Sequence, residues 1–181
     1  AVGDVVGNAD LEIVVATRAG YGGTPTPELH VFSASGTLLH HTALPHGGNM
    51  SMAPTLANLD GDAKLEIVVG ERGDSTGWTY VLDGDLTAAD EAWPQTLDHV
   101  PATGAAVGDI DNDGGPEIVM CSFYSVYAWE TDGTLLPGFP VTYPDETYSY
   151  GSPALADLNG DDSLEILVTT HGDSNRVHAV T

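Results

Sequence analysis

The sequence predicts an all-β fold made of about four repeated antiparallel units. Three observations support this prediction: an acidic segment recurs at a nearly constant spacing, a short aliphatic run follows each copy, and no stretch shows a sustained helical period with capping residues. The chain has 181 residues, and its hydrophobic content of 41% is sufficient for a packed core.

The acidic segment has the same pattern in three copies. The copy at 109–117 reads DIDNDGGPE, and related segments begin at residues 58 and 157. Each copy has an oxygen-bearing side chain at positions 1, 3 and 5 and a glutamate at position 9. A degenerate copy, DVVGNADLE, begins at residue 4, so the four starting points are separated by 54, 51 and 48 residues. This near-constant spacing indicates a structural repeat.

Strand patterns flank each acidic segment. Small and aliphatic residues alternate before it, as in Ala106-Val107-Gly108, and their small size suits the crowded inner edge of a ring. Aliphatic runs such as 118–120 follow it and are typical of buried strands. Third strands are predicted at 28–32, 79–84, 125–133 and 176–180. A turn then leads to a fourth, proline-containing strand that suits an exposed edge. Each unit is therefore a four-stranded antiparallel meander.

Units of about 50 residues with four strands and no helix are typical of the blades of a β-propeller. We therefore expect residues 1–181 to form a single propeller segment. Its blades are expected at about 1–46, 47–100, 101–147 and 148–181, and the last of them lacks its outer strand.

The acidic segments have the chemistry of calcium loops. Ca²⁺ takes six to eight oxygen ligands, and alternate positions of a tight turn supply several from one segment. The closing glutamate of an EF-hand comes at position 12, not 9, and zinc is disfavoured because these loops contain no cysteine or histidine. We expect about three Ca²⁺ ions, each held by positions 1, 3, 5 and 9 and the position 7 carbonyl. The expected ligands are Asn58, Asp60, Asp62, Lys64 and Glu66; Asp109, Asp111, Asp113, Gly115 and Glu117; and Asp157, Asn159, Asp161, Ser163 and Glu165.

Ligand charge ranks the loops. The 109–117 loop offers four carboxylates and has Gly114 at the tight-turn position 6, so we expect it to bind most strongly. The loops at 58–66 and 157–165 offer three carboxylates each. The 4–12 loop has Val6 at position 3 and is expected to be weak or empty. It retains Asp4, Asn8 and Glu12, with Asp10 as a possible substitute ligand.

Longer segments carry a resemblance to a known family. They read APTLANLDGDAKLEIVVG, AAVGDIDNDGGPEIV, VYAWETDGTLLPGFPV and SPALADLNGDDSLEILV, and they resemble the FG-GAP (VCBS) repeats of the integrin α-chain propeller. The resemblance covers essentially the whole chain. It implies Ca²⁺ in the loop between the first two strands of a blade, and a seven-bladed ring of about 350 residues. Other blades of the same parent chain, a second copy or a partner chain would then complete the ring, and a small closed four-bladed ring is the least favoured arrangement.

Charge and composition limit the partners and the setting. The net charge is −23 with only four Lys plus Arg, which argues against nucleic acid and anionic membranes as partners. The sequence shows no membrane-spanning run and no signal peptide, so we expect a mature or excised segment without membrane insertion. Millimolar Ca²⁺ favours an extracellular, cell-surface or periplasmic location. The single cysteine, Cys121, is expected to be a small core residue.

Two further motifs are interpreted as structural. RGDS at 72–75 and HGDS at 171–174 have the same offset from the loop glutamate, so Gly-Asp-Ser is expected to be a turn of the repeat in which the arginine is incidental. His30 and His178 align with tyrosines on the third strand and are expected to be packing residues. His40, His41 and His46 are expected to lie in a surface loop.

The sequence favours a non-catalytic, calcium-stabilised module that serves as a scaffold or as a protein- or glycan-binding domain. It contains no Gly-x-Ser-x-Gly, His-Glu-x-x-His or phosphate-loop motif. A lyase-like, polysaccharide-active enzyme and a lectin remain alternatives. In the enzyme, a sugar groove would be lined by Trp78, Tyr124, Tyr127, Trp129, Tyr148 and Tyr150.

Overall fold

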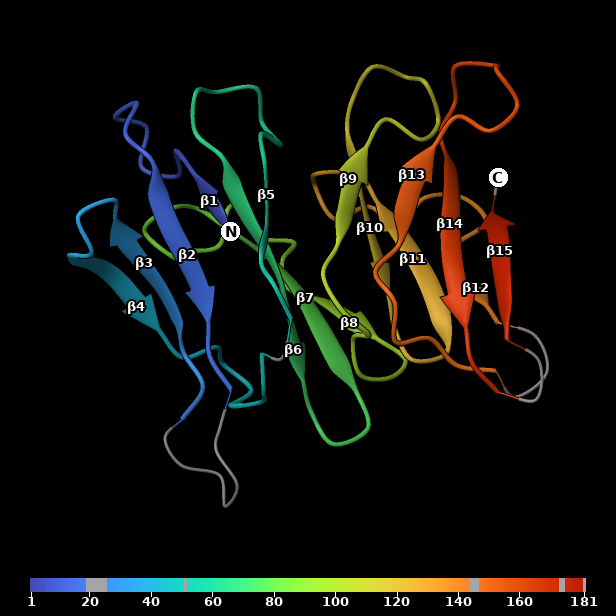
Figure 1. Ribbon diagram of the computed structural model, residues 1–181, viewed down its shortest axis with the longest axis horizontal. Helices are drawn as coiled ribbons and strands as arrows, with labels where there is room; N and C mark the ends of the chain where they lie inside the picture. The colour runs from blue at the N-terminus through green and yellow to red at the C-terminus, as the bar shows by residue number, and fades with distance from the viewer. Residues whose placement is uncertain (19–25, 51, 144–146, 173–174, 181) are drawn as a thin grey trace.

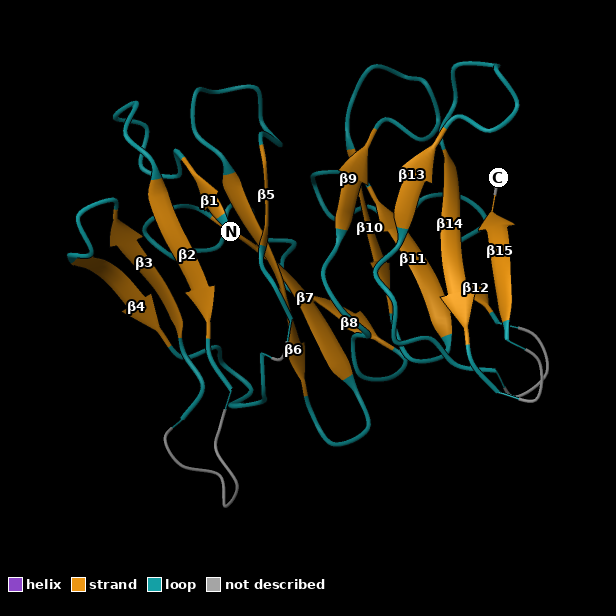
Figure 2. Cartoon of the chain, in the orientation of Figure 1, coloured by secondary structure: helices purple, strands orange, loops and turns teal. Residues whose placement is uncertain are grey.

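The computed structural model describes residues 1–18, 26–50, 52–143, 147–172 and 175–180. These residues form fifteen strands in four separate antiparallel sheets and contain no helix (Figures 1 and 2). Within this part of the chain there is accordingly no helix that could cross a membrane.

Each sheet is one blade, with its strands in chain order. The first contains β1 (Val2–Gly3), β2 (Glu12–Ala16), β3 (Leu29–Ser33) and β4 (Leu38–Thr42). The second contains β5 (Thr55–Ala57), β6 (Glu66–Arg72), β7 (Gly77–Leu82) and β8 (Gln95–Leu97). The third contains β9 (Ala106–Gly108), β10 (Glu117–Cys121), β11 (Ser125–Trp129) and β12 (Val141–Thr142). The fourth contains β13 (Ala154–Ala156), β14 (Glu165–Thr170) and β15 (Arg176–Val180). The predicted fold class is confirmed.

The first two strands of every blade pair in the same register. The residue just before the acidic loop lies opposite the loop glutamate in each case, in the pairs Gly3–Glu12, Ala57–Glu66, Gly108–Glu117 and Ala156–Glu165. In all four blades, the same pair of residues of the β-ladder therefore forms the base of the acidic loop. The fourth strands differ from expectation: Pro94 and Pro140 lie just before β8 and β12, and β4 contains no proline.

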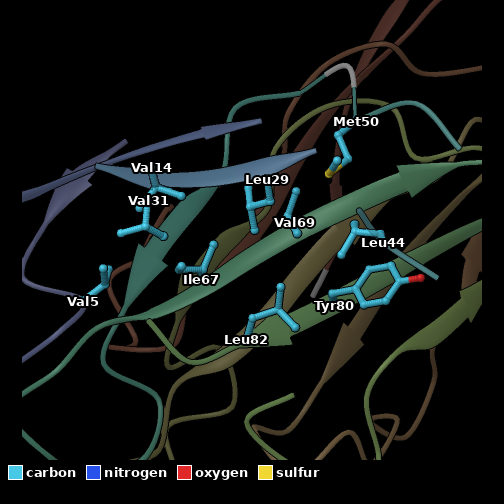
Figure 3. Close-up of a cluster of buried hydrophobic side chains, with 10 residues drawn as sticks. All are labelled: Val5, Val14, Leu29, Val31, Leu44, Met50, Ile67, Val69, Tyr80 and Leu82. Carbon is cyan, nitrogen blue, oxygen red and sulfur yellow. The ribbon is translucent and has the colours of Figure 1, made fainter. Parts of the chain in front are cut away.

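Three hydrophobic clusters fill the spaces between neighbouring blades. Figure 3 shows the first, in which side chains from β2 and β3 lie against side chains from β6 and β7. The second cluster joins the second and third blades, and the third cluster, which includes the buried Cys121, joins the third and fourth. Because the middle blades are covered on both faces, β6 and β10 are buried along almost their whole length.

The arc of blades is open at both ends. Val126 on β11 is 0% exposed because the fourth blade covers it, whereas the equivalent Val177 on β15 is 68% exposed. On the other side, Ile13 on β2 is exposed, while the equivalent Ile67 on β6 is buried against the first blade. Figure 1 shows the first and fourth blades at opposite sides of the molecule. The chain therefore does not form a closed four-bladed ring.

The loops and turns gather at two opposite ends of the blades. The acidic loops β1–β2, β5–β6, β9–β10 and β13–β14 lie at the upper end in Figure 1, which we call the acidic end. The turns β6–β7 and β10–β11 lie at the lower end, which we call the turn end. Two separate surfaces are thus available for binding.

Candidate functional site

The acidic loops share one backbone conformation. Position 4 has a positive φ in every copy: Gly7 (79°), Gly61 (81°), Asn112 (61°) and Gly160 (81°). Glycine and asparagine adopt this left-handed region at low cost. Position 6 also has a positive φ at Ala9, Gly114 and Asp162, but not at Ala63. The glycine at position 4 in three of the four copies is a second sequence signal of this turn, which sequence reasoning missed.

The loop glutamate has a structural role in every blade. It is buried, and its Oε2 accepts a hydrogen bond from the backbone N–H of position 2. The pairs are Val5–Glu12 at 3.1 Å, Leu59–Glu66 at 2.6 Å, Ile110–Glu117 at 2.6 Å and Leu158–Glu165 at 2.7 Å. Sequence reasoning treated this residue only as a ligand. The structure shows that one carboxylate oxygen fixes the loop, so a single oxygen remains for a cation.

The 109–117 loop brings its four carboxylates together. Ligand oxygens of Asp109, Asp111, Asp113 and Glu117 all lie within 4.8 Å of one another. Among the described residues, Asp109 Oδ1 and Glu117 Oε1 are buried and have no hydrogen-bond partner. Burial raises the pKa of Glu117, and the negative charge of Asp111 raises it further. Unpaired buried oxygens among like charges are costly, and a hard cation would satisfy them.

The 58–66 loop gathers three carboxylates, those of Asp60, Asp62 and Glu66, within the same distance of 4.8 Å. Asn58 at position 1 is turned toward the backbone: its Oδ1 accepts the N–H of Gly61 at 2.7 Å, and its Nδ2 donates to the carbonyl of Asp62. Burial also raises the pKa of Glu66. This loop has the donor set for a cation, with a weaker first ligand than the 109–117 loop.

The 157–165 loop is arranged around an amide. Asn159 Nδ2 donates to Asp161 Oδ2 at 2.9 Å and to Glu165 Oε1 at 3.0 Å. An amide nitrogen therefore lies between two expected ligands. The Asn159 side chain must turn its oxygen inward before this loop can bind a cation. Asp157 accepts the N–H of Gly160 at 2.6 Å, and this bond is the main cause of its lowered pKa.

The 4–12 loop satisfies its own oxygens. The Asp4 carboxylate accepts backbone N–H groups from Gly7 at 2.6 Å, Asn8 at 3.2 Å and Ala9 at 2.8 Å. Asn8 Oδ1 accepts the N–H of Asp10 at 2.9 Å. These bonds close the loop without any cation.

Position 7 is held in the same way in the three fuller loops. Its backbone N–H donates to the position 5 carboxylate in the pairs Lys64–Asp62 at 2.6 Å, Gly115–Asp113 at 2.8 Å and Ser163–Asp161 at 3.0 Å. Coordination by the position 7 carbonyls stays a prediction.

At the turn end, residues 73–75 lie in the turn between β6 and β7, as predicted for Gly-Asp-Ser, whereas Arg72 is the last residue of β6 and pairs with Gly77. The turn is closed by a hydrogen bond of 3.0 Å from the N–H of Gly73 to the carbonyl of Thr76. The matching segment at 171–174 includes residues 173–174, which lie outside the described part of the chain.

The expected surface-loop position was wrong for His40 and His41, which lie on strand β4, whereas His46 does lie in the exposed connection between β4 and β5 but is not free there. Its ring stacks on Trp78 with centroids 3.7 Å apart, and its Nδ1 lies 2.7 Å from the Tyr80 hydroxyl. The buried Glu71 accepts the Tyr80 hydroxyl at 2.5 Å and the N–H of Gly48 at 2.6 Å. The group links the first blade connection to the second blade, beside a cavity of about 580 Å³. Sequence spacing gave no signal for it.

The predicted sugar groove does not form as one surface. Tyr127 and Trp129 are buried in the cluster between the second and third blades, and Trp78 packs against His46. Aromatic residues on these strands fill the core because both faces of the third blade are covered. Tyr124, Tyr148 and Tyr150 do lie together.

These three tyrosines belong to an aromatic patch at the turn end. Its members are His99, Phe123, Tyr124, Tyr148, Tyr150 and His171. The rings of Phe123 and Tyr148 stack at 4.8 Å, whereas Tyr124 and Tyr150 are exposed. The patch combines the β10–β11 turn with the connections on either side of the third blade. Sequence reasoning missed the two histidines, which come from segments distant from the β10–β11 turn, and it also missed Phe123, the residue directly before Tyr124.

The comparisons with known proteins agree with this architecture. Residues 58–120 match the family described as FG-GAP-like repeat. The chain is also similar to the crystal structure of the PilY1 C-terminal domain from Pseudomonas aeruginosa, with a TM-score of 0.57 and 16% sequence identity. The match covers 90% of this chain and 37% of that one, so the chain spans little more than a third of that structure. No curated protein matches the chain. Residues 58–120 are therefore similar to an FG-GAP-like repeat, and the chain has the fold of an open β-propeller.

Proposed function

We propose that this chain is a calcium-stabilised propeller module of a secreted or cell-surface protein, with binding surfaces for a protein or glycan partner. The observation that carries the calcium assignment is the pair of buried, unpartnered oxygens in the 109–117 loop, Asp109 Oδ1 and Glu117 Oε1. Both oxygens belong to a group of four carboxylates within 4.8 Å, with no basic residue in the loop.

Electrostatics gives the cation a stabilising role. Four like charges at this spacing repel one another, and the net charge of −23 adds to the cost of folding. A divalent cation converts that repulsion into attraction. Carboxylate and carbonyl oxygens from a single short loop suit Ca²⁺ better than transition metals, which prefer nitrogen or sulfur donors.

The expected affinity supports an extracytoplasmic setting. These loops are short and partly exposed, and loops of this kind in extracellular modules bind Ca²⁺ with dissociation constants of about 10⁻⁴ to 10⁻³ M. Such sites fill at the millimolar Ca²⁺ outside cells. We therefore assign the chain to the extracellular space, the cell surface or the periplasm.

Thermal unfolding tests the calcium assignment. The protein is stripped with a chelator, and the melting temperature is followed as Ca²⁺ is added, with Mg²⁺ as the matched dication. We expect Ca²⁺ to raise the melting temperature in a saturable way and Mg²⁺ to raise it less. Calorimetric titration should give up to three ions per chain. An unchanged melting temperature at millimolar Ca²⁺ would overturn the assignment.

The aromatic patch favours a glycan as partner. Exposed aromatic rings offer flat apolar faces with polar edges, which suit the C–H faces and hydroxyls of a sugar ring. Tyr124 and Tyr150 are exposed members of the patch, as is His171. Because the chain has only four Lys plus Arg against 27 Asp plus Glu, neutral glycans fit better than acidic ones.

A glycan array tests this assignment in the presence of Ca²⁺. Binding should be lost in Tyr124→Ala and Tyr150→Ala and kept in Leu38→Ala, which removes an exposed apolar side chain on the first blade. Binding without turnover identifies a lectin. Cleavage of the bound glycan would instead establish the alternative function, an enzyme acting on polysaccharides. An array without signal would remove the glycan assignment and leave a protein partner.

The two open faces of the arc are assigned to further blades of the same parent chain. Residues at the same repeat position have different surroundings in different blades. Val126 is covered by the next blade, whereas Val177 at the end of the arc is uncovered. A surface with the apolar pattern of a blade interface suits another blade best.

A further inference from the structure

A cluster of two histidines and one glutamate lies on the first blade, away from the acidic loops. It consists of Glu28, His30 and His41, whose ligand atoms all lie within 4.8 Å of one another. We infer that these three residues form a site for a borderline divalent metal such as Zn²⁺. Sequence alignment of the repeats had grouped His30 with packing residues and His41 with a surface loop.

The β-sheet register places the three side chains on one face. His30 on β3 lies directly opposite His41 on β4. Glu28, two residues before His30, directly precedes β3 and continues its pairing with β2, since its carbonyl accepts the N–H of Thr17 at 2.9 Å. Side chains two apart on a strand, and side chains directly opposite on a neighbouring strand, point to the same side of a sheet. His40 is next to His41 and pairs with the buried Val31, so it belongs to the other face.

The distances match a coordination sphere. Glu28 Oε2 lies 3.3 Å from His30 Nε2 and 3.1 Å from His41 Nδ1. In a tetrahedral zinc site with metal–ligand distances of about 2.0 to 2.1 Å, neighbouring ligand atoms are about 3.3 Å apart. Two edges of the tetrahedron are therefore already present. The two imidazole rings are nearly parallel, at an interplanar angle of 15°.

The surroundings leave room for an ion. Glu28 and His30 are half-buried and His41 is exposed, so a fourth position is open to water or to another ligand. Within the described residues, His30 Nδ1 is buried without a hydrogen bond. The other ring nitrogen, Nε2, is the one that faces Glu28. The face also carries Val15, which pairs with His30 and is uncovered.

The donor atoms of this cluster favour a different metal from the one that the acidic loops favour. Two imidazoles and one carboxylate suit Zn²⁺ and related ions, whereas Ca²⁺ prefers oxygen ligands alone. The second and third blades lack the arrangement, because Tyr80 and Tyr127 occupy the position of His30 on β7 and β11. In the fourth blade His178 occupies that position on β15, but Arg176 stands in place of Glu28. Among the described residues the site is therefore found on the first blade only.

Zinc titration tests the inference. The protein is first stripped of metal and then saturated with Ca²⁺, so that Ca²⁺ occupies the acidic loops, which would otherwise compete for Zn²⁺. We expect one Zn²⁺ per chain by calorimetry, and Co²⁺ should give the visible absorption of a four-coordinate site. His41→Ala should weaken zinc binding at least about tenfold. Because His41 is exposed, this substitution should leave the metal-free melting temperature unchanged.

His40→Ala is the matched control, since it removes an imidazole from the same strand on the opposite face, and it should bind Zn²⁺ as the unmodified protein does. Glu28→Gln, which keeps the size of the side chain, should weaken binding as His41→Ala does. Absence of Zn²⁺ binding in saturating Ca²⁺, or equal binding by the His41→Ala variant and the unmodified protein, would overturn the inference. Equal loss in His40→Ala would overturn it as well, because binding would then not depend on this face.

Discussion

The backbone N–H of Ile110 donates a hydrogen bond of 2.6 Å to Glu117 Oε2, while the other oxygen of the same carboxylate has no partner among the described residues. The glutamate thus has a role in the fold, and we propose that its second oxygen has a separate role toward a cation. The first role is present even in the 4–12 loop, where Glu12 binds the N–H of Val5 although Val6 stands in place of a ligand. A loop glutamate therefore indicates a blade, and we propose that the residues at positions 1, 3 and 5 determine whether the loop can bind metal.

Replacing Glu117 with glutamine should separate the two roles. The amide oxygen of Glu117→Gln can still accept the N–H of Ile110, but the variant removes a buried charge close to Asp109 and Asp111. Without metal, the free energy of unfolding should rise by about 1 kcal/mol, because like-charge repulsion is relieved. With Ca²⁺, the stabilisation by the ion should shrink. Chemical denaturation in chelator and in millimolar Ca²⁺ measures both effects.

Glu12→Gln is the control, since it makes the same change in a loop that closes on its own hydrogen bonds. Its response to Ca²⁺ should equal that of the unmodified protein. A Glu117→Gln variant that keeps the full calcium response would contradict the role assigned to Oε1.

The acidic loops should differ in their importance for calcium binding. Asp111→Ala removes one of four gathered carboxylates from the strongest loop, whereas Asp60→Ala acts on a loop in which Asn58 is turned to the backbone. In saturating Ca²⁺, Asp111→Ala should lower the melting temperature more than Asp60→Ala. A hundredfold loss of affinity corresponds to about 2.7 kcal/mol of lost stabilisation. Equal shifts of the melting temperature would refute the ranking of the loops.

The buried Glu71 should matter for stability alone. Glu71→Ala leaves the N–H of Gly48 without its acceptor, removes the acceptor of the Tyr80 hydroxyl so that only His46 Nδ1 remains beside it, and opens a cavity at a fully buried position. Each buried group left unpaired costs about 1 to 3 kcal/mol, so we expect a total loss of about 3 kcal/mol in urea unfolding. Tyr80→Phe, which removes only the hydroxyl, should cost about 1 kcal/mol. Asp74→Ala, in the exposed turn, should stay within about 0.5 kcal/mol of the unmodified protein.

The fold could be predicted from the sequence because each blade repeats its own local signals. The residue before each loop, the loop glutamate and the aliphatic run recur together, and the observed register places Gly108 opposite Glu117 as it places Gly3 opposite Glu12. Tyr127 and Trp129 were nevertheless misjudged as groove residues. The sequence pattern of aromatic residues on a strand is the same whether the side chains face solvent or another blade. Here they face the second blade.

The surface clusters could not be predicted for a different reason. Alignment of the repeats shows which face of a strand a residue occupies. It does not show which side chains from the connections between blades pack against that face. His46 reaches Glu71 across 25 residues of sequence, and His99 and Tyr148 meet the same Phe123 from two separate connections. These contacts depend on how neighbouring blades are placed, which the spacing of motifs within one blade does not encode.

The open end of the arc yields the last prediction, because two valines at the same repeat position have opposite surroundings. Val126→Ala removes two methyl groups from a side chain that is 0% exposed, and it should cost about 2 kcal/mol. Val177→Ala makes the same change at 68% exposure and should cost less than about 0.5 kcal/mol. Leu158 and Leu59 repeat the contrast at position 2 of their loops, with 56% and 7% exposed. Urea unfolding measures the difference, and sedimentation analysis should find a monomer. An equal loss at Val177, together with a dimer in sedimentation, would show instead that a second copy of this chain covers the face.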